Sequence, residues 1–153
     1  MTCTPILDGR IRCRQAPGGY RFSADSLLLA WFVLKRRGPG GGHGLELGGG
    51  CGVISATILA GGGVDTAALL EIQHRAHQAA RETPTLNALE PRMRCLHGDL
   101  RSITLADLDG RPDAIWSNPP FHPAGEGRTP PDPALAVARH ESTCTMDDVL
   151  DAA

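Results

Sequence analysis

The sequence lacks the features that would place a protein in a membrane or outside the cell. No stretch of its 153 residues approaches the ~20 consecutive apolar residues that a membrane-spanning helix needs. The start, Met1 to Pro5, carries no basic and apolar leader, so we expect a protein that is not secreted. These absences predict a cytoplasmic protein with no membrane partner.

Paired cysteines and metal-ligand clusters are also missing. The five cysteines are scattered, at Cys3, Cys13, Cys51, Cys95 and Cys144. An odd number without a Cys-x-x-Cys pair indicates reduced thiols, neither a disulfide framework nor a metal site. His74 and His77 stand three residues apart, but no third ligand accompanies them. We interpret this pair as a solvated helix surface and expect no metal.

A general surplus of basic residues is absent, because the net charge is −2. The charges are nevertheless unevenly placed. Residues 1–43 hold seven basic and two acidic side chains, whereas residues 44–153 hold eight basic and fifteen acidic ones. The length suffices for one domain with a real core. We expect a single domain over residues 1–153, in which 1–43 form an extension and 44–153 form a cofactor-binding core.

The basic extension has its own pattern. Three arginines alternate within Ile6 to Arg14, which predicts a β-hairpin around Asp8-Gly9 with one basic face. A helix should follow and end at Lys35-Arg36-Arg37. Two interpretations of these cations carry equal weight. They contact nucleic-acid phosphates, or they form a solvated strand face and a helix end whose charge complements the helix dipole.

The remainder alternates between strand and helix patterns. Four short apolar segments predict buried strands. The first ends at Leu47, and the others are Thr66 to Ile72, Met93 to His97 and Asp113 to Ser117. Val53 to Ala60 and Gln73 to Ala80 predict helices, and the second extends to Ala88 if Pro84 only kinks it. This alternation predicts an α/β fold with a doubly wound, mostly parallel sheet.

A glycine-rich turn follows the first of these strands. Gly48, Gly50 and Gly52 alternate between Leu47 and the helix at Val53. Glycines permit positive φ angles and a close approach of backbone to ligand, so the turn is typical of nucleotide-cofactor sites of several kinds. Acids end two later strands. Glu71 is placed to accept hydrogen bonds from ribose hydroxyls, and Asp99 from an adenine amino group.

The most informative segment is Asn118-Pro119-Pro120-Phe121, which follows the last strand. Ligands of open α/β sheets bind at the carboxyl ends of strands, and a proline-rigid turn there holds the Asn118 side-chain oxygen and the Pro119 carbonyl in fixed directions. Two fixed acceptors suit an exocyclic amino group, because accepting both N–H bonds frees the nitrogen lone pair for an electrophile. Phe121 would stack on the base.

The order of these motifs resembles class I S-adenosylmethionine-dependent methyltransferases that act on amino groups. Three more stretches are similar to the bacterial tRNA1(Val) adenine-37 N6-methyltransferase family. They are Gly19 to Ala30, Gly125 to Arg128 and Ala138 to Glu141. The resemblance spans most of the chain. It implies a Rossmann-like fold, S-adenosyl-L-methionine as the cofactor, methylation of adenine N6, and tRNA or another RNA as the partner.

The resemblance also implies roles for single residues. Those expected at the cofactor are Glu46, Gly48, Gly50 and Gly52 at the methionine part, Glu71 at the ribose, Asp99 at the adenine, and Phe22, Asp25 and Asn118 beside it. Those expected to be catalytic are Asn118, Pro119, Pro120 and Phe121. His122 departs from the pattern, because the sequence Asn-Pro-Pro-Phe-His also resembles ribosomal-RNA guanine N2-methylases.

Several alternatives remain open. Glutamine N5-methylases of proteins carry a similar turn, although they do not need a basic patch. A Rossmann dehydrogenase would use the glycine turn and a strand-end acid, but it has no use for the Asn-Pro-Pro-Phe turn. The family fold has seven strands and only four are placed here, so we expect a chain incomplete at its C-terminus. Its fourth strand would be an edge that exposes Ile115 and Trp116, and a non-catalytic remnant that binds RNA or a partner subunit is a further alternative.

Overall fold

The computed structural model describes residues 1–18, 21–119 and 144–153. The N-terminal hairpin pairs β1 (Thr2–Ile6) with β2 (Ile11–Gln15) in antiparallel register. Leu7, Asp8 and Gly9 all have positive φ angles in the turn. Along β2 the buried side chains alternate with the arginines. The predicted hairpin and its basic face are therefore confirmed, although Arg14 on that face is bonded to Glu82 at 2.8 Å.

Helix α1 (Ala24–Arg37) follows and ends in the predicted basic turn. Arg37 does not project freely from this turn. Its guanidinium donates to the backbone carbonyls of Gly41, Gly63 and Asp113 at 3.1–3.2 Å. Of the three cations in the turn, Arg37 therefore joins three loops of the fold, whereas Lys35 and Arg36 are exposed.

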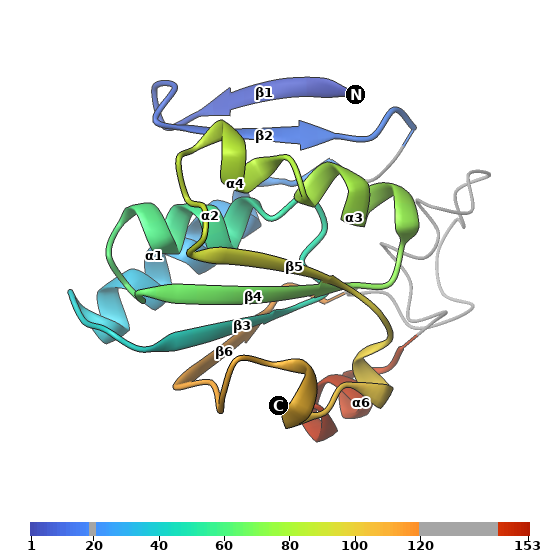
Figure 1. Cartoon of the computed structure of the whole chain (residues 1–153). Coiled ribbons are helices and arrows are strands. Elements are labelled where there is room, and N and C mark those ends of the chain that lie inside the picture. The colour runs from blue at the N-terminus through green and yellow to red at the C-terminus, as the bar shows by residue number, and fades with distance from the viewer. Residues whose placement is uncertain (19–20, 120–143) are drawn as a thin grey trace.

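The core is a four-stranded parallel sheet in the order β5-β4-β3-β6, seen in Figure 1. Its strands are β3 (His43–Leu47), β4 (Thr66–Glu71), β5 (Met93–His97) and β6 (Ala114–Ser117). The connecting helices are α2 (Val53–Ala60), α3 (His74–Ala80) and α4 (Thr83–Leu86). The predicted break in the third helix is real but comes earlier than Pro84, which lies in the first turn of α4.

The two faces of the sheet bury different clusters because side chains alternate along a strand. On the side of the long helices, Leu69 and Trp116 pack with Ile58 of α2. On the other side, Leu45, Leu47 and Leu70 pack under short elements. These are the 3₁₀ turns η1 (Leu100–Ser102) and η2 (Leu105–Asp107) and the helix α6 (Met146–Asp151), below the sheet in Figure 1.

Strand β6 lies at an edge of the sheet among the described residues. The expectation that this edge exposes Trp116 is wrong, since its side chain is only 4% exposed. The indole lies against Gly44 of β3, where a Cβ atom would stand 2.1 Å from the ring. The absence of a side chain at Gly44 thus makes room for the largest residue of the edge strand. None of the helices in the described ranges has the length and hydropathy that a bilayer crossing needs.

The strand order also fixes where a ligand can bind. The chain passes from β3 outward through β4 to β5 and then returns to the opposite side of β3 as β6. The direction of winding therefore reverses between β3 and β6. In open α/β sheets, ligands occupy the crevice beyond the carboxyl ends of the strands at such a reversal.

Candidate functional site

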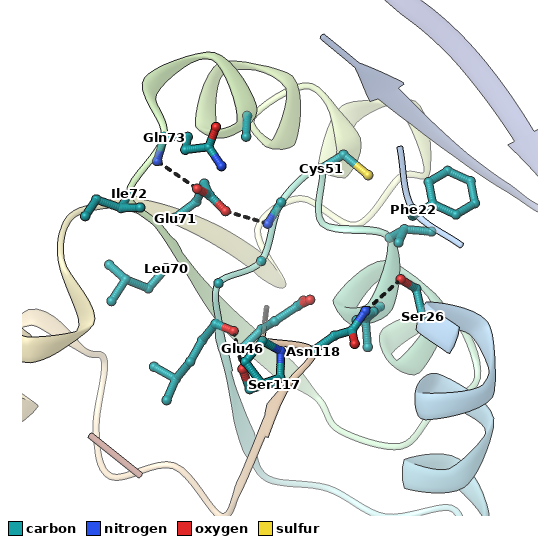
Figure 2. A pocket seen from close by; sticks show the side chains of 18 of the residues that line it. Phe22, Ser26, Glu46, Cys51, Leu70, Glu71, Ile72, Gln73, Ser117 and Asn118 are labelled. Carbon is teal, nitrogen blue, oxygen red and sulfur yellow. Dashed lines mark hydrogen bonds between the residues drawn. The ribbon is translucent and has the colours of Figure 1, made fainter. Parts of the chain in front are cut away.

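A pocket of about 440 Å³ lies at this point, within the range typical of small-molecule sites. It is lined by the residues that follow β3, β4, β5 and β6, and by the segment that leads from the hairpin into α1. Figure 2 shows side chains from these separate elements directed at one space. The strand-end residues singled out from the sequence are thus brought together by the sheet.

The glycine turn after β3 contains two kinds of glycine. Gly48 and Gly50 line the pocket, have φ angles of +69° and +56°, and have open space where a Cβ would stand. Gly52 does not line it, so the structure departs from the predicted contact at this residue. A Cβ on Gly52 would stand 2.6 Å from Met93 and 3.0 Å from Leu69. Its left-handed conformation starts α2 against the core.

Glu46 precedes this turn and is fully buried, with 1% of its surface exposed. Its Oε2 accepts a hydrogen bond from the Ser55 backbone N–H at 3.0 Å and another from the Ser55 hydroxyl. It thereby caps α2, whose own N-cap residue supplies no side-chain bond. The Trp116 indole N–H has no partner of ordinary hydrogen-bond geometry, yet its proximity favours the ionised carboxylate.

Burial dominates the ionisation of Glu46. The loss of solvation raises the pKa of its carboxyl from 4.5 to about 7, against the two bonds from Ser55, which lower it. The nearby Glu71 raises it further. A carboxyl in this state is ready to ionise fully when a cation enters the pocket, because an opposite charge nearby lowers the pKa.

Glu71 ends β4 and is 5% exposed. Its two carboxylate oxygens each accept one backbone N–H, from Gly50 at 2.8 Å and from Gln73 at 2.7 Å, as Figure 2 shows. Burial raises the pKa of this carboxyl, and the backbone bonds oppose that effect. A carboxylate has about four lone-pair sites, so both oxygens retain capacity for further donors such as a pair of ribose hydroxyls.

Asp99, which follows β5, also lines the pocket, but its carboxylate is already engaged. The Arg101 guanidinium donates to both of its oxygens, and the Arg101 backbone N–H donates to Oδ1 at 3.0 Å. These bonds lower the pKa of Asp99. Its carboxylate therefore has less capacity left for a ligand than the sequence suggested, because a neighbour two residues away competes for it.

Asn118 follows β6 and faces the pocket beside the glycine turn. The Ser117 hydroxyl donates to the Leu47 carbonyl at 2.9 Å, which ties the end of β6 to the end of β3. Pro119 lines the pocket as well. Pro120 and Phe121, predicted at the catalytic turn, lie outside the described residues, as do the stretches from Gly125 to Arg128 and from Ala138 to Glu141.

Phe22, just before α1, and Asp25, in its first turn, were both predicted, and both line the pocket. Among the lining residues that were not predicted, two are buried polar residues of the hairpin and α1. Gln15 at the end of β2 is 4% exposed, and Ser26 in the first turn of α1 is 3% exposed. Buried polar side chains are uncommon without a role, but no pattern in the sequence distinguishes these two from ordinary surface residues.

The histidine pair acquires a neighbour that the sequence did not reveal. The rings of His74 and His77 lie 5.4 Å and 5.1 Å from that of His97. In the part of the chain that the structure describes, no group of three His, Cys, Asp or Glu side chains is arranged to hold a metal ion. None of the five cysteines, all of which lie in the described ranges, forms a disulfide.

Comparison with known proteins places this arrangement in context. The chain is 33% identical over 118 residues to the ribosomal RNA small subunit methyltransferase C of Pseudomonas entomophila, with 77% of this chain and 34% of that protein covered. It is 29% identical over 133 residues to the tRNA1(Val) (adenine(37)-N6)-methyltransferase of Porphyromonas gingivalis, with 85% and 51% covered. The chain thus spans about one third to one half of the length of these curated relatives.

Solved structures agree on the fold. TYW2 of M. jannaschii in complex with AdoMet superposes with a TM-score of 0.61 at 13% identity, covering 74% of this chain and 49% of that one. A ribosomal protein L11 methylase from Lactobacillus delbrueckii subsp. bulgaricus gives 0.55 at 22% identity, covering 74% and 56%. Residues 23–130 match the family described as "Methyltransferase small domain". The chain therefore belongs to this family of S-adenosylmethionine-dependent methyltransferases.

Proposed function

We propose that the chain carries the cofactor and target-amine sites of an RNA methyltransferase that modifies the exocyclic amino group of a base, adenine N6 in tRNA. The observation that carries this proposal is the position of Asn118. Its carboxamide follows β6 and lines the same pocket as the glycine turn of β3 and Glu71 of β4. An amide directed at a nucleotide-cofactor pocket from the point where the sheet reverses suits a reaction at an amino group.

The pocket fits S-adenosylmethionine by the chemistry of its donors and acceptors. Glu71 has carboxylate lone pairs left for ribose hydroxyls, and Gly48 and Gly50 leave space for close backbone approach. Glu46 is the buried acid nearest in sequence to the glycine turn, which suits the positive charge of an amino acid's ammonium group. When bound, S-adenosylmethionine supplies an electrophilic methyl group.

The protein's own residues would activate the amine. The Asn118 Oδ1 and the Pro119 carbonyl accept the two N–H bonds of the amino group, which directs its lone pair toward the electrophile. Both acceptors also stabilise the positive charge that develops on nitrogen as it becomes tetrahedral. The amine loses its proton only after it has gained the methyl group, so no general base is required among these residues.

The choice of RNA rests on the relatives. The Porphyromonas gingivalis relative bears the name of a tRNA adenine N6-methyltransferase and aligns with the larger share of this chain, 85%. A second candidate is guanine N2 in ribosomal RNA. It is favoured by the higher identity, 33%, to the ribosomal RNA small subunit methyltransferase C of Pseudomonas entomophila, and by the His122 that follows the Asn-Pro-Pro-Phe turn.

The decisive experiment combines Asn118→Ala with a matched control. Asn87→Ala also removes a hydrogen-bonded carboxamide, because the Asn87 side chain bonds to the backbone of Arg12 and Thr83, and none of these three residues lines the pocket. We expect Asn118→Ala to retain S-adenosylhomocysteine affinity by calorimetry and to lose roughly 10²–10³ in single-turnover rate, or ~2.7–4 kcal/mol. We expect Asn87→Ala to lower the melting temperature and to keep its rate per folded molecule.

The substrates are a tRNA1(Val) transcript and a 16S ribosomal RNA transcript, with radiolabelled S-adenosylmethionine and nucleoside mass spectrometry of the product. N6-methyladenosine in the tRNA supports the proposal, and N2-methylguanosine in the ribosomal RNA supports the second candidate. A wild-type rate in folded Asn118→Ala would contradict the catalytic role. Cofactor binding without methylation of either RNA would favour a non-catalytic binding role, and binding of NAD alone would favour a dehydrogenase.

A further inference from the structure

The proposed function leaves one buried polar contact of the pocket unused. Ser26 lies in the first turn of α1 and is one of two buried residues of that helix, with Ala30. The remaining inward positions of α1 are apolar and pack on the core. A serine hydroxyl at such a position stabilises the fold only if it has a partner, because an unpaired buried hydroxyl costs free energy.

The partner is the proposed catalytic amide. Asn118 Nδ2 donates to Ser26 Oγ at 3.3 Å, and Figure 2 shows the two side chains reaching toward each other from the end of β6 and the start of α1. The residues are 92 positions apart.

This contact decides which end of the amide is available to a substrate. An asparagine carboxamide has one acceptor oxygen and one NH₂ group with two donors. If the NH₂ end faced an exocyclic amine, two donors would oppose each other and the amine would not be activated. A hydroxyl can accept as well as donate, so Ser26 can take the NH₂ end and leave Oδ1 for the target.

We propose that Ser26 is the positioning residue of the site, which holds the Asn118 NH₂ group on the α1 side so that Oδ1 accepts from the target amine. This inference rests on the proposed function. It adds that α1, which precedes the cofactor-binding core in sequence, takes part in the chemistry through one hydroxyl. Ser26 touches neither reacting atom and acts only through Asn118.

The test compares Ser26→Ala, which removes the hydroxyl, with Ser26→Thr, which restores one. We expect Ser26→Ala to keep S-adenosylhomocysteine affinity and RNA KM and to lose about tenfold in single-turnover rate, as for one hydrogen bond. Ser26→Thr should recover most of that loss. Thr57→Val is the matched control. It removes another buried helix hydroxyl, which bonds to the Val53 carbonyl at 2.8 Å, and it should leave the rate unchanged.

A second measurement does not depend on catalysis. The side-chain amide protons of Asn118 give a pair of signals in a ¹⁵N-correlated NMR spectrum, which Asn118→Asp identifies by their disappearance. A hydrogen-bonded amide proton resonates downfield and exchanges slowly. We expect Ser26→Ala to move these signals upfield and to speed their exchange, whereas Ser26→Thr and Thr57→Val should leave them in place.

The outcomes separate this inference from the proposed function. A wild-type rate and unshifted Asn118 signals in Ser26→Ala would overturn the positioning role, even if Asn118→Ala is inactive. A lower melting temperature with an unchanged rate in Ser26→Ala would show that the contact only joins α1 to β6, and would overturn it too. The failure of Asn118→Ala to affect the rate would instead overturn the proposed function.

Discussion

Stability should fall as the pH rises from about 5 to 7 because of Glu46. The carboxyl is fully buried in the core beside the pocket, and burial raises its pKa from an ordinary 4.5 to about 7. Between these two pH values the folded protein retains a proton that the unfolded chain has released. The free energy of unfolding therefore falls with rising pH in this window and levels off above pH 7.

The magnitude follows from the two pKa values, 4.5 and about 7. A difference of one pKa unit corresponds to about 1.4 kcal/mol, so Glu46 should cost the folded state about 3 kcal/mol once it is fully ionised. Glu46→Gln removes the titration and keeps an acceptor oxygen for the Ser55 N–H. We expect this variant to match the wild type at pH 5 and to be more stable than it by about 3 kcal/mol at pH 8.

Urea unfolding of both proteins at pH 5, 6, 7 and 8 measures this difference. Ser55→Ala is an informative companion, because it removes a hydroxyl bond that lowers the pKa of Glu46, so its decline in stability should extend to higher pH. A stability difference between Glu46→Gln and the wild type that does not change with pH would refute the reasoning. It would mean that Glu46 titrates alike in the folded and unfolded states.

The same titration should appear in ligand binding if Glu46 faces the cofactor's ammonium group. Only the ionised carboxylate attracts a cation, so we expect the wild type to bind S-adenosylhomocysteine more tightly at pH 8 than at pH 6. In Glu46→Gln the affinity should be lower and should no longer depend on pH through this residue. Calorimetry at both pH values tests this, and an equal pH dependence in the two proteins would place the ammonium group elsewhere.

Three other substitutions probe the pocket and the sheet. Gly48→Val should abolish S-adenosylhomocysteine binding with little change in circular dichroism. A branched side chain is disfavoured at a φ of +69°, and here it would fill open space of the pocket that the ligand needs; unchanged affinity would contradict this. Glu71→Ala should weaken binding by ~1.5–3 kcal/mol, and Asp99→Ala by less because Arg101 already occupies that carboxylate; calorimetry showing the reverse order would mean that one strand end is misassigned. Gly44→Ala should lower the free energy of unfolding by about 1–3 kcal/mol in urea titrations, because its Cβ would stand 2.1 Å from the edge-strand indole; an undiminished stability would show that the indole moves aside.

The elements and much of the site could be predicted from sequence because their signals are local. Helix α2 occupies the predicted residues, β5 also does, and β4 and β6 differ from their predicted bounds by one residue. Apolar runs between turns, glycines before a helix and prolines after a strand act through neighbouring residues. For the same reason the sequence predicts a site at the glycine turn and Asn118, and Gly48, Gly50 and Asn118 do line the pocket.

The pairing of distant segments required the tertiary structure. Nothing near Asn118 in the sequence indicates that β6 pairs with β3 and not with β5, yet that choice places the amide beside the glycine turn. The pairing also brings Trp116 against Gly44, a contact between residues 72 positions apart in the sequence. Two predicted ligand contacts also depended on distant or competing partners. Gly52 packs against the core and does not line the pocket, and the carboxylate of Asp99 is engaged by Arg101.

The sequence by itself determined the class of chemistry, because the residue types at strand ends restrict what a pocket can bind. The tertiary structure decided which of these residues meet and in what state. Ser26 reaches Asn118 only once the fold brings the start of α1 to the end of β6, and Glu46 holds its proton to about pH 7 only after the core has excluded water around it. Burial and hydrogen-bond partners are properties of the packed chain, so no local pattern could reveal them.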